Sequence, residues 1–235
     1  MEINGISNKS HLVVGLGEVG QALQKIFKCD GEDKYKNIFA SEDKYKVLHI
    51  AFPYNEKFIE EVQKYQEKYQ PKYTVIHSSV PIGTSRKLNA THSPIRGVHP
   101  HLEEGIYIFK KFVGGPDAFE VANLFKPFRI NCLCTLKQEN TEAGKLWDTT
   151  QYGVMILLNK EIKDFCEKNG LDFNIVYEIF NETYNEGYLK CFRPEVVRPY
   201  LKFMEGKIGG HCVIQNAKLL DSDSAKRVLN KNATF

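Results

Sequence analysis

The sequence has no apolar run that approaches the length of a membrane span, and it has no long block of charges of one sign. Its 32 basic and 29 acidic residues are scattered along 235 residues and leave a formal net charge of +3. These absences argue against a membrane protein and against a nucleic-acid-binding surface. The first ten residues show neither the apolar core of a signal peptide nor an arginine-rich transit pattern, so we expect a cytoplasmic protein.

Cysteine pairs with the spacing of metal ligands are also missing. In a reducing compartment most of the six cysteines should be thiols; they are Cys29, Cys132, Cys134, Cys166, Cys191 and Cys212. Strand ends converge in α/β folds, so histidines could offer another metal site, but no pair has the four-residue spacing of ligands on a helix. The histidines considered are His77, His99, His101 and His211. We expect no metal.

What the sequence does contain is a glycine-rich turn near its start. A G-x-G-x-x-G follows the apolar run 11–14 and precedes a predicted helix over 21–27. The first glycine makes a tight bend, the second lets the backbone approach a pyrophosphate, and the third lets helix and strand pack closely. We therefore predict dinucleotide binding, with a tight structural turn as the alternative. The predicted cofactor-binding residues of the turn are Gly15, Leu16, Gly17, Glu18, Val19 and Gly20.

Apolar stretches and amphipathic stretches alternate after this turn. We expect strands over 37–40, 46–52, 73–77, 95–99, 111–114 and 129–136, and helices over 53–70 and 116–126, with a short helix after residue 84. The 42% hydrophobic content is enough to build a core for such a fold. The alternation predicts a doubly wound parallel sheet.

The carboxyl ends of the predicted strands give further candidates, because open parallel sheets bind ligands there. Phe52 and Pro53, where the third strand ends, are expected to line the cofactor. Glu42 follows the predicted second strand, where a ribose-binding acid would stand, and Asp43 or Ser41 could replace it. Because exposed acids in a turn give the same pattern, the choice between NAD and NADP stays open.

The pattern changes at Glu139, where apolar residues begin to recur three or four apart. No proline interrupts this pattern before Gly170, whose position suits a C-terminal cap, so we predict one long helix and helical structure after it. We divide the chain into a cofactor domain, 1–136, and a helical substrate or dimerisation domain, 137–235. The long helix, which includes Trp147, is either buried in its own domain or the seam of a homodimer.

Two motifs in the second domain contain reactive side chains. Cys212 follows paired glycines and His211, and a thiol becomes a nucleophile where a cation or a helix N-terminus stabilises its thiolate. A buried, inert cysteine is the alternative. Lys145 lies one helical turn before Thr149, near the start of the long helix, where a positive charge is electrostatically unfavourable and so indicates a site.

The order of the motifs resembles the UDP-glucose/UDP-sugar 6-dehydrogenase family. The motifs are the G-x-G-x-x-G, Ser78-Ser-Val-Pro-Ile-Gly-Thr84, Glu142-Ala-Gly-Lys-Leu146 and Gly209-Gly-His-Cys212. The resemblance covers the cofactor domain and the central helical domain of that family. It implies a Rossmann-type sheet followed by a smaller all-helical domain that starts with a long helix, and NAD bound at the glycine turn.

The resemblance also implies catalytic roles. Cys212 matches the cysteine that captures an aldehyde as a thiohemiacetal and later becomes a thioester. Lys145 matches the lysine that stabilises oxyanions, and Ser79 stands where the family has a threonine that positions water and substrate. Thr149 replaces the asparagine that partners the lysine, and Asn216 replaces an aspartate, so Asn216 cannot serve as a general base.

We therefore expect an NAD(P)-dependent oxidoreductase that transfers a hydride from an alcohol or aldehyde, with a small substrate such as a sugar derivative. Two alternatives remain. His99-Pro-His101, after Gly97, resembles a segment of prephenate-type dehydrogenases, and Lys145 could act as the acid-base of a beta-hydroxyacid dehydrogenase. The other alternative is a dinucleotide-binding sensor or assembly protein whose catalytic groups are degraded.

Overall fold

The computed structural model describes residues 9–209 and 212–234. By its contacts the chain divides into two compact units, Met1–Lys145 and Leu146–Phe235. The division falls inside one long helix, α6 (Gln138–Lys168), which starts in the first unit and continues in the second. The first unit therefore contains the whole sheet together with the first turns of α6.

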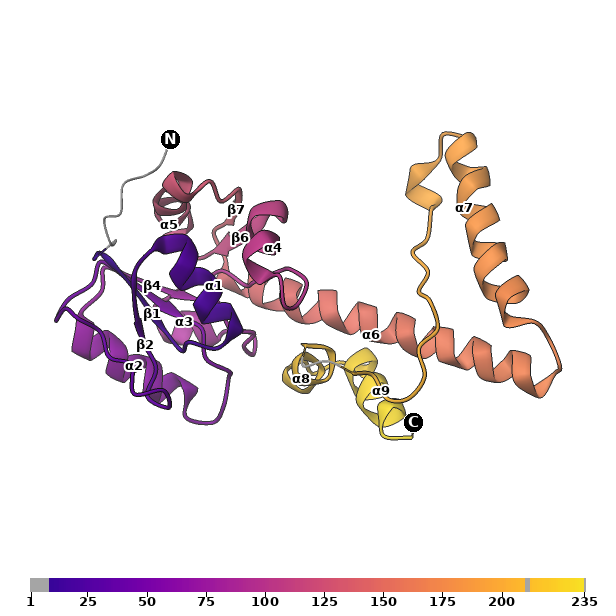
Figure 1. Ribbon diagram of the computed structural model, residues 1–235, viewed down its shortest axis with the longest axis horizontal. Helices are drawn as coiled ribbons and strands as arrows, with labels where there is room; N and C mark the ends of the chain where they lie inside the picture. The colour runs from indigo at the N-terminus through magenta and orange to yellow at the C-terminus, as the bar shows by residue number, and fades with distance from the viewer. Residues whose placement is uncertain (1–8, 210–211, 235) are drawn as a thin grey trace. The chain divides into compact units, whose positions relative to one another are not determined.

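The first unit is built on one sheet of seven strands, in the order β2-β1-β3-β4-β5-β6-β7 (Figure 1). Neighbouring strands are parallel except β5 and β6, which form a single antiparallel pair, His92 with Gly114. The strands are β1 (His11–Val14), β2 (Asp30–Glu32), β3 (Val47–Ile50), β4 (Tyr73–Ile76), β5 (Thr91–His92), β6 (Lys111–Gly114) and β7 (Cys132–Thr135). The predicted α/β sheet is confirmed, as a mixed and mostly parallel one.

Helices cover both faces of this sheet because alternate strand residues point to opposite sides. Val13, Val47 and Val75 face one core, which α1 (Glu18–Phe27), α4 (Leu102–Ile108) and α5 (Ala118–Phe125) cover. Leu12, Leu48 and Ile76 face the other core, which α2 (Phe58–Tyr69) covers. The 3-10 turn η1 (Lys126–Phe128) follows α5, and the short helix α3 (Thr84–Lys87) follows β4.

Two of the predicted strands are wrong. The second strand is β2, not residues 37–40, which lie in a turn where Ile38 makes one isolated bridge to Asp33. The strand after α3 is β5, whereas residues 95–99 have no regular structure. In both places the true strand is short and polar, and its pairing with a neighbour, not its hydropathy, defines it.

The second unit is helical, as expected. Its core joins α6 to α8 (Cys212–Leu219) and α9 (Asp223–Asn232) through Leu146, Leu157 and Val228 among others. A Cβ on Gly153 would stand 2.8 Å from Cγ1 of Val213, so this glycine lets α6 and α8 approach closely. The remaining elements are a π-helical turn η2 (Asn174–Ile179), α7 (Phe180–Lys190) and a 3-10 turn η3 (Pro194–Val196).

Three details of the second unit bear on the predictions. Gly170, at φ +62°, ends α6, and the N–H of Leu171 donates to the carbonyl of Cys166 at 2.8 Å, which confirms the predicted cap. The helical structure predicted after Gly170 includes two separate helices at its end, since α9 begins anew after Ser222, whose Oγ accepts the N–H of Ala225. Much of the segment 191–209 is irregular and not helical.

Candidate functional site

The glycine turn between β1 and α1 uses each glycine for a different reason. Gly15 has φ +88°, and a Cβ there would lie 2.8 Å from the backbone nitrogen of Phe52. A Cβ on Gly20 would lie 1.8 Å from the carbonyl oxygen of Gly15, so only glycine fits at that position. Around Gly17, in contrast, a Cβ would meet nothing within 4 Å. The structure needs Gly15 and Gly20 for its own packing and leaves space beside Gly17.

That space belongs to a cavity of about 400 Å³ at the carboxyl ends of β1, β2 and β3. It is lined by Val14, Gly15, Gly17, Glu32, Asp33, Lys34, Tyr35, Ala51, Phe52, Pro53, Asn55, Glu61 and Tyr65. Of the predicted cofactor-binding residues, Gly15, Gly17, Phe52 and Pro53 come together around it. A concave, partly apolar site where parallel strands end is the usual place for a ligand in such sheets.

Asp33 is the acid at the end of β2, and sequence reasoning missed it. Its carboxylate accepts the backbone N–H groups of Leu16 at 2.8 Å, Tyr35 at 2.9 Å and Lys36 at 3.2 Å. Burial alone would raise the pKa of Asp33, but these hydrogen bonds lower it below its usual value. Asp33 is thus held as an anion against the glycine turn.

The choice of Glu42 as the ribose-binding acid rested on the misplaced second strand, and the structure removes that reason. Glu42 lies in a bend after Ser41, its side chain is 38% exposed, and it forms an ion pair with Lys9 at 2.6 Å. Asp33, at the end of β2, holds the position at which a ribose-binding acid is expected. The sequence signal for Asp33 is its spacing from Gly15, because it lies 18 residues after this first glycine and Glu42 lies 27 residues after it, whereas about 20 is typical of this fold.

Glu18 places a carboxylate in the first turn of α1. It is exposed and accepts a hydrogen bond from His99 Nδ1, at 2.7 Å, when that nitrogen carries a proton. The contact ties the start of α1 to the segment before α4. His99, which the sequence analysis singled out, therefore lies at the rim of the glycine turn.

The loop after β4, which contains Ser78 and Ser79, is held against the first turns of α6 by hydrogen bonds to Glu142, which we call the clasp. One oxygen of Glu142 accepts the N–H of Gly83 at 2.6 Å, and the other accepts the N–H of Ser85 at 2.8 Å. Glu142 is fully buried, and desolvation raises its pKa although both hydrogen bonds oppose this. The glutamate of the predicted E-x-x-K motif thus acts as an anchor for the loop that carries Ser79.

His92 strengthens the same clasp from β5. Its Nδ1 lies 2.8 Å from Oγ1 of Thr141 on α6, and its Nε2 lies 3.2 Å from the carbonyl oxygen of Ser78. Burial lowers the pKa of His92 to about 3, so the ring is neutral. Lys145 follows on α6 one turn after Thr141 and Glu142 and belongs to the first unit.

In the second unit the structure brings two predicted catalytic residues together. The amide Nδ2 of Asn216 donates to Oγ1 of Thr149 at 3.1 Å, and that hydroxyl donates to the carbonyl of Leu146 at 3.1 Å. Cys212 is half-buried and begins α8. Gly210 and His211, which belong to the predicted cysteine motif, lie outside the described residues. The pairing of Cys212 with Lys145 stays a prediction.

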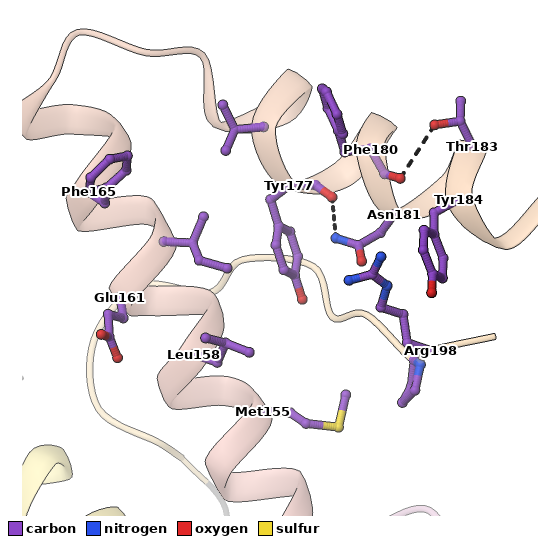
Figure 2. Close-up of a pocket in the computed structure, with 13 residues that line it drawn as sticks. Met155, Leu158, Glu161, Phe165, Tyr177, Phe180, Asn181, Thr183, Tyr184 and Arg198 are labelled. Atoms are coloured by element: carbon purple, nitrogen blue, oxygen red, sulfur yellow. Dashed lines mark hydrogen bonds between the residues drawn. The ribbon is translucent and has the colours of Figure 1, made fainter. Parts of the chain in front are cut away.

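A larger hollow of about 830 Å³ lies within the second unit, between α6 and the η2–α7 segment (Figure 2). Its walls are apolar and aromatic, and they include Leu158, Phe165 and Phe180, which are between 52% and 67% exposed. Arg198 lies at one end, 3.6 Å from the ring centre of Tyr184. No residue predicted to be catalytic lines this groove, which we call the α6–α7 groove.

Between residues 9 and 209 and between 212 and 234, no three side chains of the histidine, cysteine, aspartate or glutamate type are grouped as ligands of a metal ion. Over the same residues, no helix combines the length and the apolar character needed to cross a membrane.

Comparison with known proteins places this geometry in a recognisable fold. No family model matches the sequence, and no curated protein matches it. Among solved structures, a UDP-D-ManNAc dehydrogenase from Pyrococcus horikoshii is similar over 96% of this chain and 69% of its own, at 15% identity and a TM-score of 0.73.

Two further structures are similar over nearly their whole length. A 3-hydroxyisobutyrate dehydrogenase from Mycobacterium tuberculosis shares 12% identity over 97% of this chain and 94% of its own, with a TM-score of 0.71. A conserved protein of unknown function, itself similar to 3-hydroxyacid dehydrogenases, shares 13% identity over 95% of both chains, with a TM-score of 0.66. The chain therefore has the Rossmann-like fold that these dehydrogenases share.

Proposed function

We propose that this protein is an NAD-dependent dehydrogenase that oxidises a CH–OH group of a small molecule such as a sugar derivative. The observation that carries the proposal is the cavity at the glycine turn. Two of its glycines are required by packing, whereas the space beside Gly17 has no structural purpose inside the chain. A glycine that leaves open space at a helix N-terminus suits the close approach of a pyrophosphate.

The residues around the cavity fit a dinucleotide. The N–H groups in the first turn of α1 have no partner within the helix and point toward its N-terminal end, where phosphate charge is favoured. Asp33 supplies a carboxylate at the position of a ribose contact, and its negative charge disfavours a 2′-phosphate. Lys34, which could offset that charge, is paired with Glu61 at 2.8 Å. We therefore propose NAD over NADP.

Calorimetric titration with NAD and NADP tests this proposal. Gly17→Ala should abolish NAD binding, because the new methyl enters the cavity, while the thermal unfolding midpoint stays within about 2 °C of the parent. Gly187→Ala is the matched control, since a Cβ there also meets nothing within 4 Å and lies in α7, away from the cavity. Equal binding by the parent and Gly17→Ala would contradict the proposal.

We also propose roles for the predicted catalytic residues. When bound, the nicotinamide cofactor supplies a hydride acceptor. The chain must orient the alcohol and accept its hydroxyl proton, for which we propose Ser79 and Lys145, with Cys212 as the nucleophile if the aldehyde is oxidised further. Absorbance of reduced nicotinamide across hydroxy acids and nucleotide sugars tests turnover, and Lys145→Ala should abolish it without loss of NAD binding.

One observation favours a second candidate function. Asn216 and Thr149 are the two residues that depart from the dehydrogenase pattern, and they are hydrogen-bonded to each other within the second unit. This supports a dinucleotide-binding sensor or assembly protein without chemistry at Cys212. Binding of NAD by the parent, with no turnover on any substrate of the panel, would favour this candidate.

We further propose that a second copy of the chain covers the α6–α7 groove. None of the residues of α7 is buried, although an isolated helix of this length is marginal in water. A symmetric dimer would bury the exposed Phe165 and Phe180. Analytical ultracentrifugation should show a dimer that Phe180→Glu converts to a monomer. Phe192→Glu, at a position 90% exposed and outside the groove, should leave the dimer intact.

A further inference from the structure

A row of ionisable side chains crosses the core of the first unit. His11 on β1, His49 on β3, His77 directly after β4 and Lys111 on β6 are each no more than 3% exposed. The strands β1, β3 and β4 are neighbours in the sheet, so the three histidines are adjacent although 38 and 28 residues separate them in sequence. None of these four groups belongs to the proposed dinucleotide cavity.

The imidazoles are linked in one direction. Nε2 of His49 lies 2.9 Å from Nδ1 of His11, and Nε2 of His77 lies 2.9 Å from Nδ1 of His49. A neutral imidazole carries one proton, so it donates through one nitrogen and accepts through the other. Because every link joins an Nδ1 to an Nε2, the tautomer of one ring fixes the tautomers of all three.

The end of the row sets that direction. Nδ1 of His77 lies 2.8 Å from the carbonyl oxygen of Ser93, which can only accept a hydrogen bond. His77 therefore carries its proton on Nδ1 and accepts at Nε2 from His49. It follows that His49 and His11 also carry their protons on Nδ1.

Lys111 closes the row as an amine. Its Nζ contacts the carbonyls of Ser93 and Pro94, the latter at 2.9 Å, and lies 3.2 Å from Nδ1 of His77. A neutral amine satisfies this geometry, because two N–H groups donate to the carbonyls and the lone pair faces the Nδ1–H. An ammonium would aim a third N–H at another N–H. Burial lowers the pKa of Lys111 well below its ordinary value, in agreement with the geometry.

We propose that His11, His49, His77 and Lys111 form a proton path through the core of the first unit, with Lys111 as its neutral, proton-accepting end. A proton arriving at Nε2 of His11 releases the Nδ1 proton to His49, which passes its own to His77, which passes its own to Lys111. Each N–H bond that breaks is replaced by one on the next group. The outcome is three rings in the Nε2–H tautomer and one ammonium.

Aromatic rings pack against the row of histidines. The ring of Phe27 stacks on His49 at 4.6 Å between centres, and Phe125 lies within 6.5 Å of both His49 and His77. The other charged or titratable groups that act on the row are Lys46 at the His11 end, His92 near His77, and Lys145 and Cys132 near Lys111. The proposal does not depend on dinucleotide binding.

Nitrogen NMR of the full chain, labelled in its histidine rings, tests the direction of the path. At pH 7.5 the three buried rings should be neutral and carry their protons on Nδ1, assigned by single substitution of each histidine. The exposed His101 serves as the reference for an unconstrained ring. Protons on Nε2 in the three buried rings, or cationic rings, would overturn the proposal.

Exchange into heavy water tests whether protons move. The backbone N–H of His77 donates to the carbonyl of Ile50 at 2.9 Å and exchanges only when the sheet opens. Transfer along the row should make the Nδ1–H of His77 exchange at least about ten-fold faster than that amide. Equal rates would show a static network and refute the path.

A substitution that cuts the row separates transfer from packing. His49→Phe retains an aromatic ring between Phe27 and its neighbours and should slow the exchange of His77 Nδ1–H to the rate of the amide. His101→Phe should change nothing. If His49→Phe does not fold, His11→Phe removes only the outer end and carries the same expectation. Unchanged fast exchange in a folded cut variant would also refute the path.

Discussion

Four buried histidines should make the first unit sensitive to mild acid. Desolvation lowers the pKa of His11 to about 4 and of His92 to about 3, and it lowers those of His49 and His77 well below 6.5. In the folded protein these rings stay neutral as the pH falls, whereas in the unfolded chain they take up protons near pH 6.5. The unfolded state therefore gains stability below that pH, and the free energy of unfolding decreases.

The size of this effect follows from the width of the pKa gap. Each ring that stays neutral lowers the free energy of unfolding by about 1.4 kcal/mol per pH unit below 6.5. At pH 5 this amounts to about 2 kcal/mol relative to pH 7.5 for each of His11 and His92, and His49 and His77 add to the loss in the same direction. A domain has only about 5 to 15 kcal/mol of stability, so unfolding near pH 5 is expected.

Carboxyl groups do not change this expectation in that range. The lowered pKa values of Asp30 and Asp33 add to the loss only below about pH 4, and the raised pKa of Glu142 offsets a small part of it. Between pH 7.5 and 5 the histidines therefore set the slope together with Lys111, because the unfolded lysine also holds a proton that the folded one refuses.

Urea unfolding followed by circular dichroism, at half-unit steps from pH 7.5 to 5, measures the slope. His92→Asn should reduce it by about 1.4 kcal/mol per pH unit, because one of the four titrating rings is gone. His101→Gln, at an exposed position, should leave it unchanged. A free energy of unfolding that stays flat over this range would refute the reasoning, since it would mean that the folded core accepts the protons.

Three other substitutions test separate parts of the structure. Gly20→Ala should destabilise the protein by about 3 kcal/mol or more in urea unfolding, because the new Cβ meets a backbone oxygen that has no room to move; a loss below about 1 kcal/mol would show that the turn relaxes. Glu142→Ala leaves two buried N–H groups unpaired and should cost about 2 to 5 kcal/mol, whereas Glu142→Gln, which keeps one acceptor, should cost less; equal losses would argue against the clasp. The unfolded chain binds a proton at Lys111 below pH 10.5 that the folded protein refuses, so the free energy of unfolding of the parent should rise by about 1.4 kcal/mol per pH unit toward pH 10. Lys111→Met should remove this rise. An unchanged slope would mean that Lys111 is charged in the folded protein.

The parts of the fold that depend on local pattern could be predicted from the sequence. The glycine turn, the helix α2 and the single helix α6 up to Gly170 all follow from spacing and from the absence of proline. Of the predicted site, Gly15, Gly17, Phe52 and Pro53 do line one cavity. Adjacent positions in a turn and at a strand end need no long-range information.

The parts that depend on which strands pair could not be predicted in this way. The sequence Asp30-Gly-Glu has no apolar residue and becomes an edge strand only because β1 pairs with it. Misplacing it by a few residues moved the expected ribose contact from Asp33 to Glu42. The row of histidines was missed for a related reason, since residues 11, 49 and 77 become neighbours only through the strand order β1-β3-β4.

The position of Glu142 and Thr141 on α6 has a consequence for anyone who dissects this protein. A fragment that stops at residue 136, where the sheet ends, would lose the hydrogen-bond partners of the Gly83 N–H, the Ser85 N–H and the His92 ring. A fragment that stops at Lys145 would keep them. The start of α6 thus completes the hydrogen bonding of the sheet unit, although its sequence pattern is that of the helical domain. A truncation placed where the sequence pattern changes would therefore remove part of the first unit.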